Sequence, residues 1–152
     1  MNVFRSVVLV AAVVAAGLQA GSYYIWAFAV LPGVARADDR TFVTVLNHMN
    51  RAIVNPVFML TFLGAPVLAA VGTVLAEPSS RPWTLVALVL AVATLVVTFA
   101  ANIPLNNALD AGAGAPAAAR AAFETAWQGW NGLRVATSTG ALVALAGALV
   151  SG

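Results

Sequence analysis

The sequence predicts an all-α protein of the membrane: a four-helix transmembrane bundle with one short amphipathic helix after the first span. Of its 152 residues, 62% are hydrophobic and only 8% are charged. Residues 6–35, 52–76, 82–109 and 135–152 contain no charged side chain at all. A bilayer core about 30 Å thick needs roughly 20 apolar residues per helix, so each of these stretches can hold one span.

The composition excludes several kinds of site. The chain has no cysteine, which excludes disulfides, cysteine–zinc sites, iron–sulfur clusters and thiolate catalysis. Its single histidine, His48, excludes a multi-histidine metal site within one chain, and we expect no metal. No glycine-rich strand–helix junction suits a dinucleotide or flavin, so no cofactor is evident. Seven arginines and no lysine give a net charge of +2, which is too small and too dispersed for binding nucleic acid.

The N-terminal apolar run has two interpretations. Arg5, the apolar residues after it and the small residues at 35–37 resemble a secretory signal with its cleavage site. The apolar region of a signal is only about 7–15 residues long, and the run here is about twice that. It also carries Tyr23, Tyr24 and Trp26 near its far end, where an aromatic belt would lie. A retained first span is therefore favoured.

Proline positions set the expected ends of the spans. Pro32 and Gly33 oppose continuation of the first helix, and Pro104 does the same for the third. A helix is expected to start near Pro116 and to run without a break into the last span. We expect one integral membrane domain over residues 1–152, with spans at about 3–30, 56–76, 83–101 and 131–150.

The amphipathic helix is expected at about 39–55, with Asp38 or Asp39 as its N-cap. At 100° per residue its apolar side chains form one stripe, made of Phe42, Val45, Leu46, Met49 and Ile53. The opposite stripe is polar, and we expect it to face inward, toward the last span: Asn47, Asn50, Arg51 and Asn55.

An even number of spans places both termini on one side and the two long connections on the other. Most arginines lie on the long-loop side, and the positive-inside rule then places these loops in the cytoplasm, with the protein in a bacterial inner (plasma) membrane. The two halves of the chain also echo each other. Leu31-Pro32 and Ile103-Pro104 are each followed by a loop and then by an asparagine and an arginine, so a duplicated helical hairpin is a hypothesis.

The polar residues of the spans have structural and functional interpretations. Arg134 either anchors the helix at the interface by snorkelling or donates to an anion inside a pocket. Asn55 and Asn102, each shortly before a proline, favour helix capping, whereas Asn50 and Asn131 suit either interhelical hydrogen bonding or a pocket. His48 lies at the edge of its polar stripe, which favours exposure over catalysis.

Four motifs in this order resemble the anthrone-oxygenase-like family of small four-helix membrane proteins. They are Leu31-Pro32-Gly33, Asn50-Arg51 through Asn55-Pro56, Asn102-Ile103-Pro104-Leu105-Asn106, and Trp127, Trp130, Asn131 and Arg134. The resemblance covers nearly the whole chain, although Asn47 stands where family members often carry glutamine. It implies oxidation of an anthrone to an anthraquinone with O2 in polyketide pathways.

Such a reaction needs a base, oxyanion donors and a dry aromatic slot. His48 or Glu124 is the nearest candidate base. The candidate catalytic residues are Arg134, Asn131, Arg51, Asn50 and His48. The candidate substrate-binding residues are Trp127 and Trp130, which could flank a flat ring, with Asn55, Asn102 and Asn106.

The expected partners are the lipid bilayer and a lipophilic aromatic small molecule, with a homo-oligomer left open. One alternative is a non-catalytic membrane protein that binds a lipid, a quinone or a partner protein. A small transporter working as a dimer is a third hypothesis, which the lack of a string of intramembrane acids disfavours.

Overall fold

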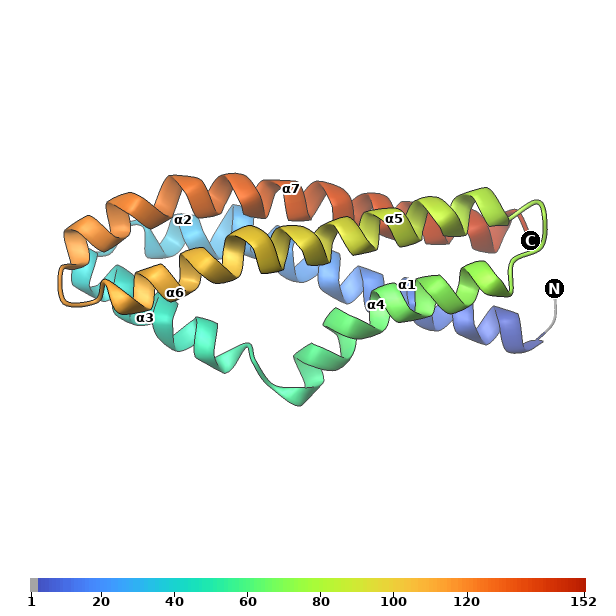
Figure 1. The fold of residues 1–152 in the computed structure, drawn as a ribbon, viewed down its shortest axis with the longest axis horizontal. Coiled ribbons are helices and arrows are strands. Elements are labelled where there is room, and N and C mark those ends of the chain that lie inside the picture. The colour runs from blue at the N-terminus through green and yellow to red at the C-terminus, as the bar shows by residue number, and fades with distance from the viewer. Residues whose placement is uncertain (1–2) are drawn as a thin grey trace.

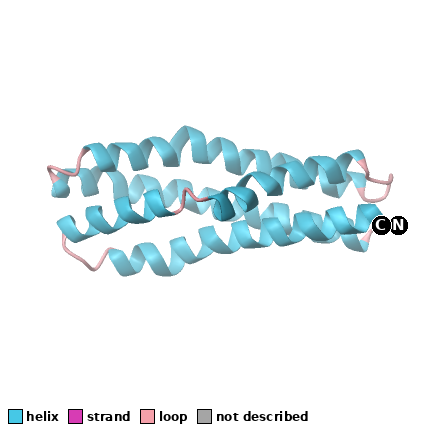
Figure 2. Ribbon diagram, turned by 90° about the horizontal axis from the view of Figure 1, so that it is seen from below, coloured by secondary structure: helices cyan, strands magenta, loops and turns pink. Residues whose placement is uncertain are grey.

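The computed structural model describes residues 3–152, and over that range it consists of helices joined by short turns (Figures 1 and 2). Within the described residues, four continuous helical rods are long and apolar enough to cross a membrane, at Val3–Val34, Pro56–Val74, Arg81–Ala111 and Pro116–Val150. The first rod begins and the last rod ends at the same end of the bundle (Figure 1). The predicted all-α membrane bundle is confirmed.

The first and third rods continue past the prolines that were expected to end them. The first consists of α1 (Val3–Ile25), the π-helical turn η1 (Trp26–Val30) and α2 (Leu31–Val34). The third consists of α5 (Arg81–Val97), the π-helical turn η2 (Thr98–Asn102) and α6 (Ile103–Ala111). The helix ends predicted at residues 30 and 101 were therefore wrong.

A π turn explains why both helices survive their prolines. In an α-helix the proline ring clashes with the carbonyl one turn back. In η1 the Leu31 amide bonds instead to the Trp26 carbonyl, five residues earlier, and in η2 the Ile103 amide bonds to the Thr98 carbonyl. This wider turn immediately before Pro32 or Pro104 relieves the clash. The same device at the same offset in both halves supports the duplicated-hairpin hypothesis.

The two halves differ in the rod that follows. In the second half, α7 (Pro116–Val150) is one unbroken helix of 35 residues. In the first half, the corresponding length is divided into α3 (Asp39–Ala52) and α4 (Pro56–Val74), which meet at an angle at residues 53–55 (Figure 1). The Asn55 side chain accepts a hydrogen bond from the Phe58 amide at 3.0 Å, which confirms its predicted role as a cap.

The predicted amphipathic helix is α3, which packs on the bundle through its apolar stripe, as expected, while only part of its polar stripe faces inward. Asp38 caps it by accepting from the Thr41 amide at 3.0 Å. Its apolar side chains Phe42, Val43 and Leu46 are buried in a cluster with residues of α6 and α7. Burying this apolar face removes more hydrocarbon from water than burying the polar stripe would. Of the polar stripe, Asn47 is buried and Asn50 is half-buried, whereas Arg51 and Asn55 are exposed, contrary to the expectation for these two residues.

The bundle is held at its two ends by arginines. At the end where the chain termini lie, Arg5 is buried, pairs with Glu77 and donates to the Ser80 hydroxyl. Between the ends, α1, α4, α5 and α7 pack through small side chains, which allow close approach of helices in lipid. The helix α4 has 19 residues, or about 28 Å, which matches the hydrocarbon thickness of a bilayer.

At the long-loop end, Arg120 connects α7 to the segment between α2 and α3. It donates to the carbonyl oxygens of Ala35 at 2.7 Å and Ala37 at 3.0 Å. It also pairs with Asp39 and with Glu124, and its guanidinium lies over the ring of a buried phenylalanine of α3. Glu124 therefore forms an ion pair with Arg120 at the long-loop end of the bundle.

Candidate functional site

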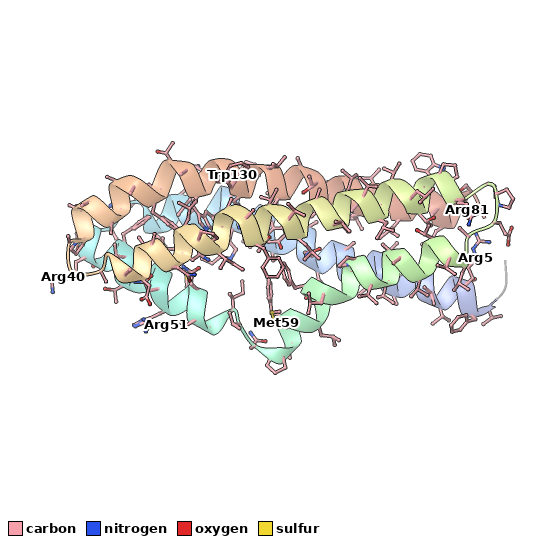
Figure 3. The ribbon with its side chains drawn as sticks, viewed as in Figure 1. Arg5, Arg40, Arg51, Met59, Arg81 and Trp130 are labelled. Atoms are coloured by element: carbon pink, nitrogen blue, oxygen red, sulfur yellow. The ribbon has the colours of Figure 1, made fainter. Side chains whose placement is uncertain are left out.

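A cavity of about 230 Å³ lies between the α3–α4 break and the middle of the bundle. One side is formed by residues at the break and at the start of α4, including Ile53 and Met59. Figure 3 shows Met59 at the angle between the two helices. The other side is formed by α1, both π turns and α7. The volume exceeds the engineered cavity of about 150 Å³ that binds benzene, so it suits a ligand of more than one ring.

Six of the residues that line the cavity are aromatic: Tyr23, Trp26, Phe58, Phe62, Phe99 and Trp127. Within this set, Trp26 and Trp127 have ring centroids 5.5 Å apart. Phe62 contacts both Phe58 and Phe99, with centroids 6.0 Å apart in each pair. Rings in such contact give a rigid apolar wall for a flat ligand.

Arg134 is the charged residue of the cavity wall. It is buried, and its guanidinium lies 4.5 Å from the ring centroid of Tyr23 and 5.2 Å from that of Trp127. Its Nη2 donates to Asn131 Oδ1 at 2.8 Å, and Asn131 Nδ2 in turn donates to the Tyr23 carbonyl at 3.2 Å. Among the described residues, Nε of Arg134 has no hydrogen-bond partner, and no acidic residue forms an ion pair with this arginine.

Two asparagines leave further polar atoms open at the cavity. Asn102, in η2, is 1% exposed, and neither Oδ1 nor Nδ2 has a partner in the described part of the chain. Asn50 in α3 likewise has an unpartnered Nδ2. Asn106 differs, because its Oδ1 accepts from Nε1 of Trp127 at 2.8 Å. Buried polar atoms are rarely left unpaired, and a cluster of them around one cavity is typical of a binding site.

The sequence missed the contribution of the first helix. Tyr23 and Trp26 were assigned to an aromatic belt, yet both line the cavity. The Tyr23 hydroxyl accepts from Gln19 Nε2 at 3.4 Å, and Thr98 and Arg134 also lie within reach of it. A buried glutamine one turn before a tyrosine, in an otherwise apolar span, was the signal that could have revealed this inward polar face.

The structure brings together only some of the predicted site residues. Those that line the cavity or directly support it are Arg134, Asn131, Asn50, Trp127, Asn102 and Asn106. Asn102 does not cap α6, contrary to the prediction, and is available to the cavity instead.

The other predicted site residues lie elsewhere. The Arg51 side chain is 67% exposed and pairs with Asp110 Oδ1 at 2.7 Å, outside the cavity (Figure 3). Trp130 is 44% exposed on the outer side of α7, so it does not roof a pocket with Trp127. His48 is exposed and Asn55 is the cap of α4. Because α3 packs on the bundle through its apolar stripe, Arg51 and His48 lie on its outward side.

The cavity reaches the outer surface of the bundle. Three of its lining residues, Val54, Phe99 and Ile103, are also exposed, Val54 to 71%. The opening therefore lies between the start of α4 and the junction of η2 with α6, and it is apolar.

Over residues 3–152, no three histidine, aspartate or glutamate side chains come together as a set of metal ligands.

Comparison with known proteins identifies a family. A family model described as anthrone oxygenase matches residues 42–144, about two thirds of the chain. The matched stretch includes both asparagines with open atoms and the Asn131–Arg134 pair. No curated protein and no solved structure matches.

Proposed function

The chain belongs to the anthrone oxygenase family, and from this premise we propose that it is a membrane enzyme that oxidises a flat, lipophilic aromatic substrate with O2. The observation that carries the proposal is the buried Arg134, which has no acidic partner among the described residues and lies against an aromatic cavity. A cation held in this way is expensive unless its site regularly binds negative charge.

The reaction creates that negative charge. The central CH2 group of an anthrone loses a proton, and the electron pair moves onto the ring carbonyl as an oxyanion. Arg134 and the open amide groups donate to this oxyanion, and the aromatic wall keeps water away from it. The anion then passes electrons to O2. Overall one anthrone and one O2 give one anthraquinone and one water, with no further reductant.

The base predicted from the sequence is not at the cavity. His48 is exposed and Glu124 pairs with Arg120. No carboxylate or imidazole occurs among the described residues that line the cavity. In our proposal the protein therefore lowers the free energy of the anthrone anion, and the proton is transferred to solvent or to reduced oxygen. We propose no resident cofactor for this step.

The absence of a base among the described lining residues also favours one competing function, the non-catalytic binding of a quinone or lipid. Purified protein in nanodiscs should be mixed with anthrone, and O2 uptake should be measured together with the absorbance of the product. Turnover above that of protein-free nanodiscs supports the enzyme. If the product binds but no O2 is consumed, the binding function replaces it.

We also propose a bacterial inner membrane with the long loops in the cytoplasm. Arg36, Arg40, Arg51 and Arg120 lie on the long-loop side, against Arg5 and Arg81 on the other (Figure 3). Arg134 is buried and does not enter the comparison. Periplasmic and cytoplasmic reporters fused after Gly152 test this orientation, and activity of the cytoplasmic reporter would contradict it.

A further inference from the structure

Among the described residues that line the cavity, three buried donor groups and one buried acceptor have no partner. The donors are Nε of Arg134 and Nδ2 of Asn50 and Asn102, and the acceptor is Oδ1 of Asn102. We infer that Asn102 is a specificity-determining residue whose side chain accepts a hydrogen bond from a hydroxyl group of the ligand. The inference rests on the proposed function only in placing the substrate in this cavity.

The local backbone explains why Asn102 is open. An asparagine in or next to a helix usually bonds to a nearby backbone group or caps the next turn. Asn102 is the last residue of η2 and precedes the Ile103-Pro104 pair, and it makes no capping bond to α6. It is 99% buried, so water at the surface does not replace a partner. Both of its polar atoms are left for whatever the cavity binds.

The kind of ligand follows from the acceptor. Arginine and amide NH2 groups can be satisfied by any acceptor oxygen, including those of a quinone. Oδ1 of Asn102 needs a donor, which a quinone or a hydrocarbon chain cannot supply. Because both ends of the amide are open, the choice between its two flipped orientations does not alter this requirement. A hydroxylated aromatic ketone satisfies all of these groups at once.

The difference in affinity between ligands with and without a hydroxyl donor should be large enough to measure. A site that leaves one of its buried polar groups unpaired loses about 1–3 kcal/mol, which corresponds to roughly tenfold to a hundredfold in affinity. The expected discrimination is against a methoxy group as much as against hydrogen, because methylation removes the donor while keeping the oxygen.

The test uses 2-hydroxyanthraquinone, 2-methoxyanthraquinone and anthraquinone as probes, bound to the full-length protein in nanodiscs. Binding is followed by quenching of tryptophan fluorescence, since Trp127 lines the cavity. The pH is set so that the hydroxyl stays protonated, as judged from the probe's absorbance, and partition into protein-free nanodiscs is subtracted. The variants are Asn102→Leu and, as a matched control, Asn107→Leu, which changes an exposed asparagine of α6.

Wild type and Asn107→Leu should bind the hydroxy probe about tenfold to a hundredfold more tightly than the methoxy probe, and Asn102→Leu should bind the two equally. Equal binding of the two probes by wild type overturns the inference, and this comparison needs no variant to fold. A preference retained in Asn102→Leu overturns it as well. Loss of the preference together with normal anthrone turnover would leave the proposed function standing. A preference that depends on Asn102, found without any anthrone turnover, would support the inference and contradict the proposed enzyme.

Discussion

Arg134 lies over the ring of Tyr23, with 4.5 Å between its Cζ atom and the ring centroid, while Asn131 connects the same arginine to the Tyr23 backbone. The guanidinium is thus fixed between α1 and α7 by neutral groups only. This arrangement orients the arginine without neutralising it, and a ligand anion would find the full positive charge in place.

Replacing Arg134 with lysine tests the role of the planar guanidinium. Lysine keeps the charge but cannot both donate to Asn131 and present Nε to the cavity, so we expect turnover or affinity for a phenolate to fall about tenfold to a hundredfold. The measurement is anthrone-dependent O2 uptake at equal amounts of folded protein. Arg51→Lys is the matched control, since Arg51 is exposed and outside the cavity. Wild-type activity of Arg134→Lys would show that the arginine is only an anchor.

Asn102→Leu should stabilise the ligand-free protein. Leucine has the same number and branching of side-chain heavy atoms as asparagine and removes two buried polar atoms that have no partner, so the gain is expected at about 1–3 kcal/mol. Thermal unfolding in detergent, without ligand, measures the shift relative to wild type and Asn107→Leu. A structural asparagine would give the opposite sign, so a lower melting temperature for Asn102→Leu would argue against a binding role.

Arg120→Met should weaken the long-loop end of the bundle. The change keeps much of the apolar stem but removes the donors to the Ala35 and Ala37 carbonyls, for an expected loss of about 1–3 kcal/mol. Its ion pairs are partly exposed and add little. Hydrogen exchange of residues 35–45 should rise selectively. Arg40→Met, on the same end, controls for charge, and equal effects of both variants would contradict the role assigned to Arg120.

The Asp38 cap predicts that the start of α3 becomes less stable at acidic pH. Hydrogen bonds from the Thr41 side chain and backbone lower the pKa of Asp38 from its ordinary 3.8. A carboxylate whose pKa is lowered on folding stabilises the fold above its unfolded pKa and loses that contribution as the pH falls through the folded value. Amide exchange at the start of α3, corrected for its intrinsic pH dependence, should therefore accelerate below about pH 4.

Asp38→Asn keeps an N-cap acceptor but has no proton to gain. The acid-dependent part of the exchange should vanish in this variant, while protection at neutral pH stays close to that of wild type. Identical acid behaviour of the two proteins would show that another group is responsible.

The features that depend on neighbouring residues alone were predicted from the sequence. The number of spans, the start of α7 at Pro116 and the caps at Asp38 and Asn55 follow from hydrophobicity and cap preferences. Pro32 and Pro104 misled the prediction, because an isolated proline does not reveal the π turn that accommodates it.

The candidate site was recovered only in part, for a different reason. Arg134 and Asn131 were found because polar groups in an apolar span are costly and therefore informative. Arg51 and Trp130 were placed wrongly because the face of a helix that meets its neighbours is decided by packing between elements distant in sequence. Trp130 is only three residues from Trp127, yet one is exposed and the other is buried.

The length of α4 bears on where the proposed substrate would enter the protein. If the 19 residues of α4 span the hydrocarbon layer, as their length allows, its first residues and the opening beside them lie at the boundary between acyl chains and headgroups. Flat amphiphiles such as hydroxylated aromatics collect at that boundary with their oxygen atoms turned toward water. The bilayer then concentrates and pre-orients the substrate in two dimensions, so part of the entropy of capture is already spent before the protein is encountered.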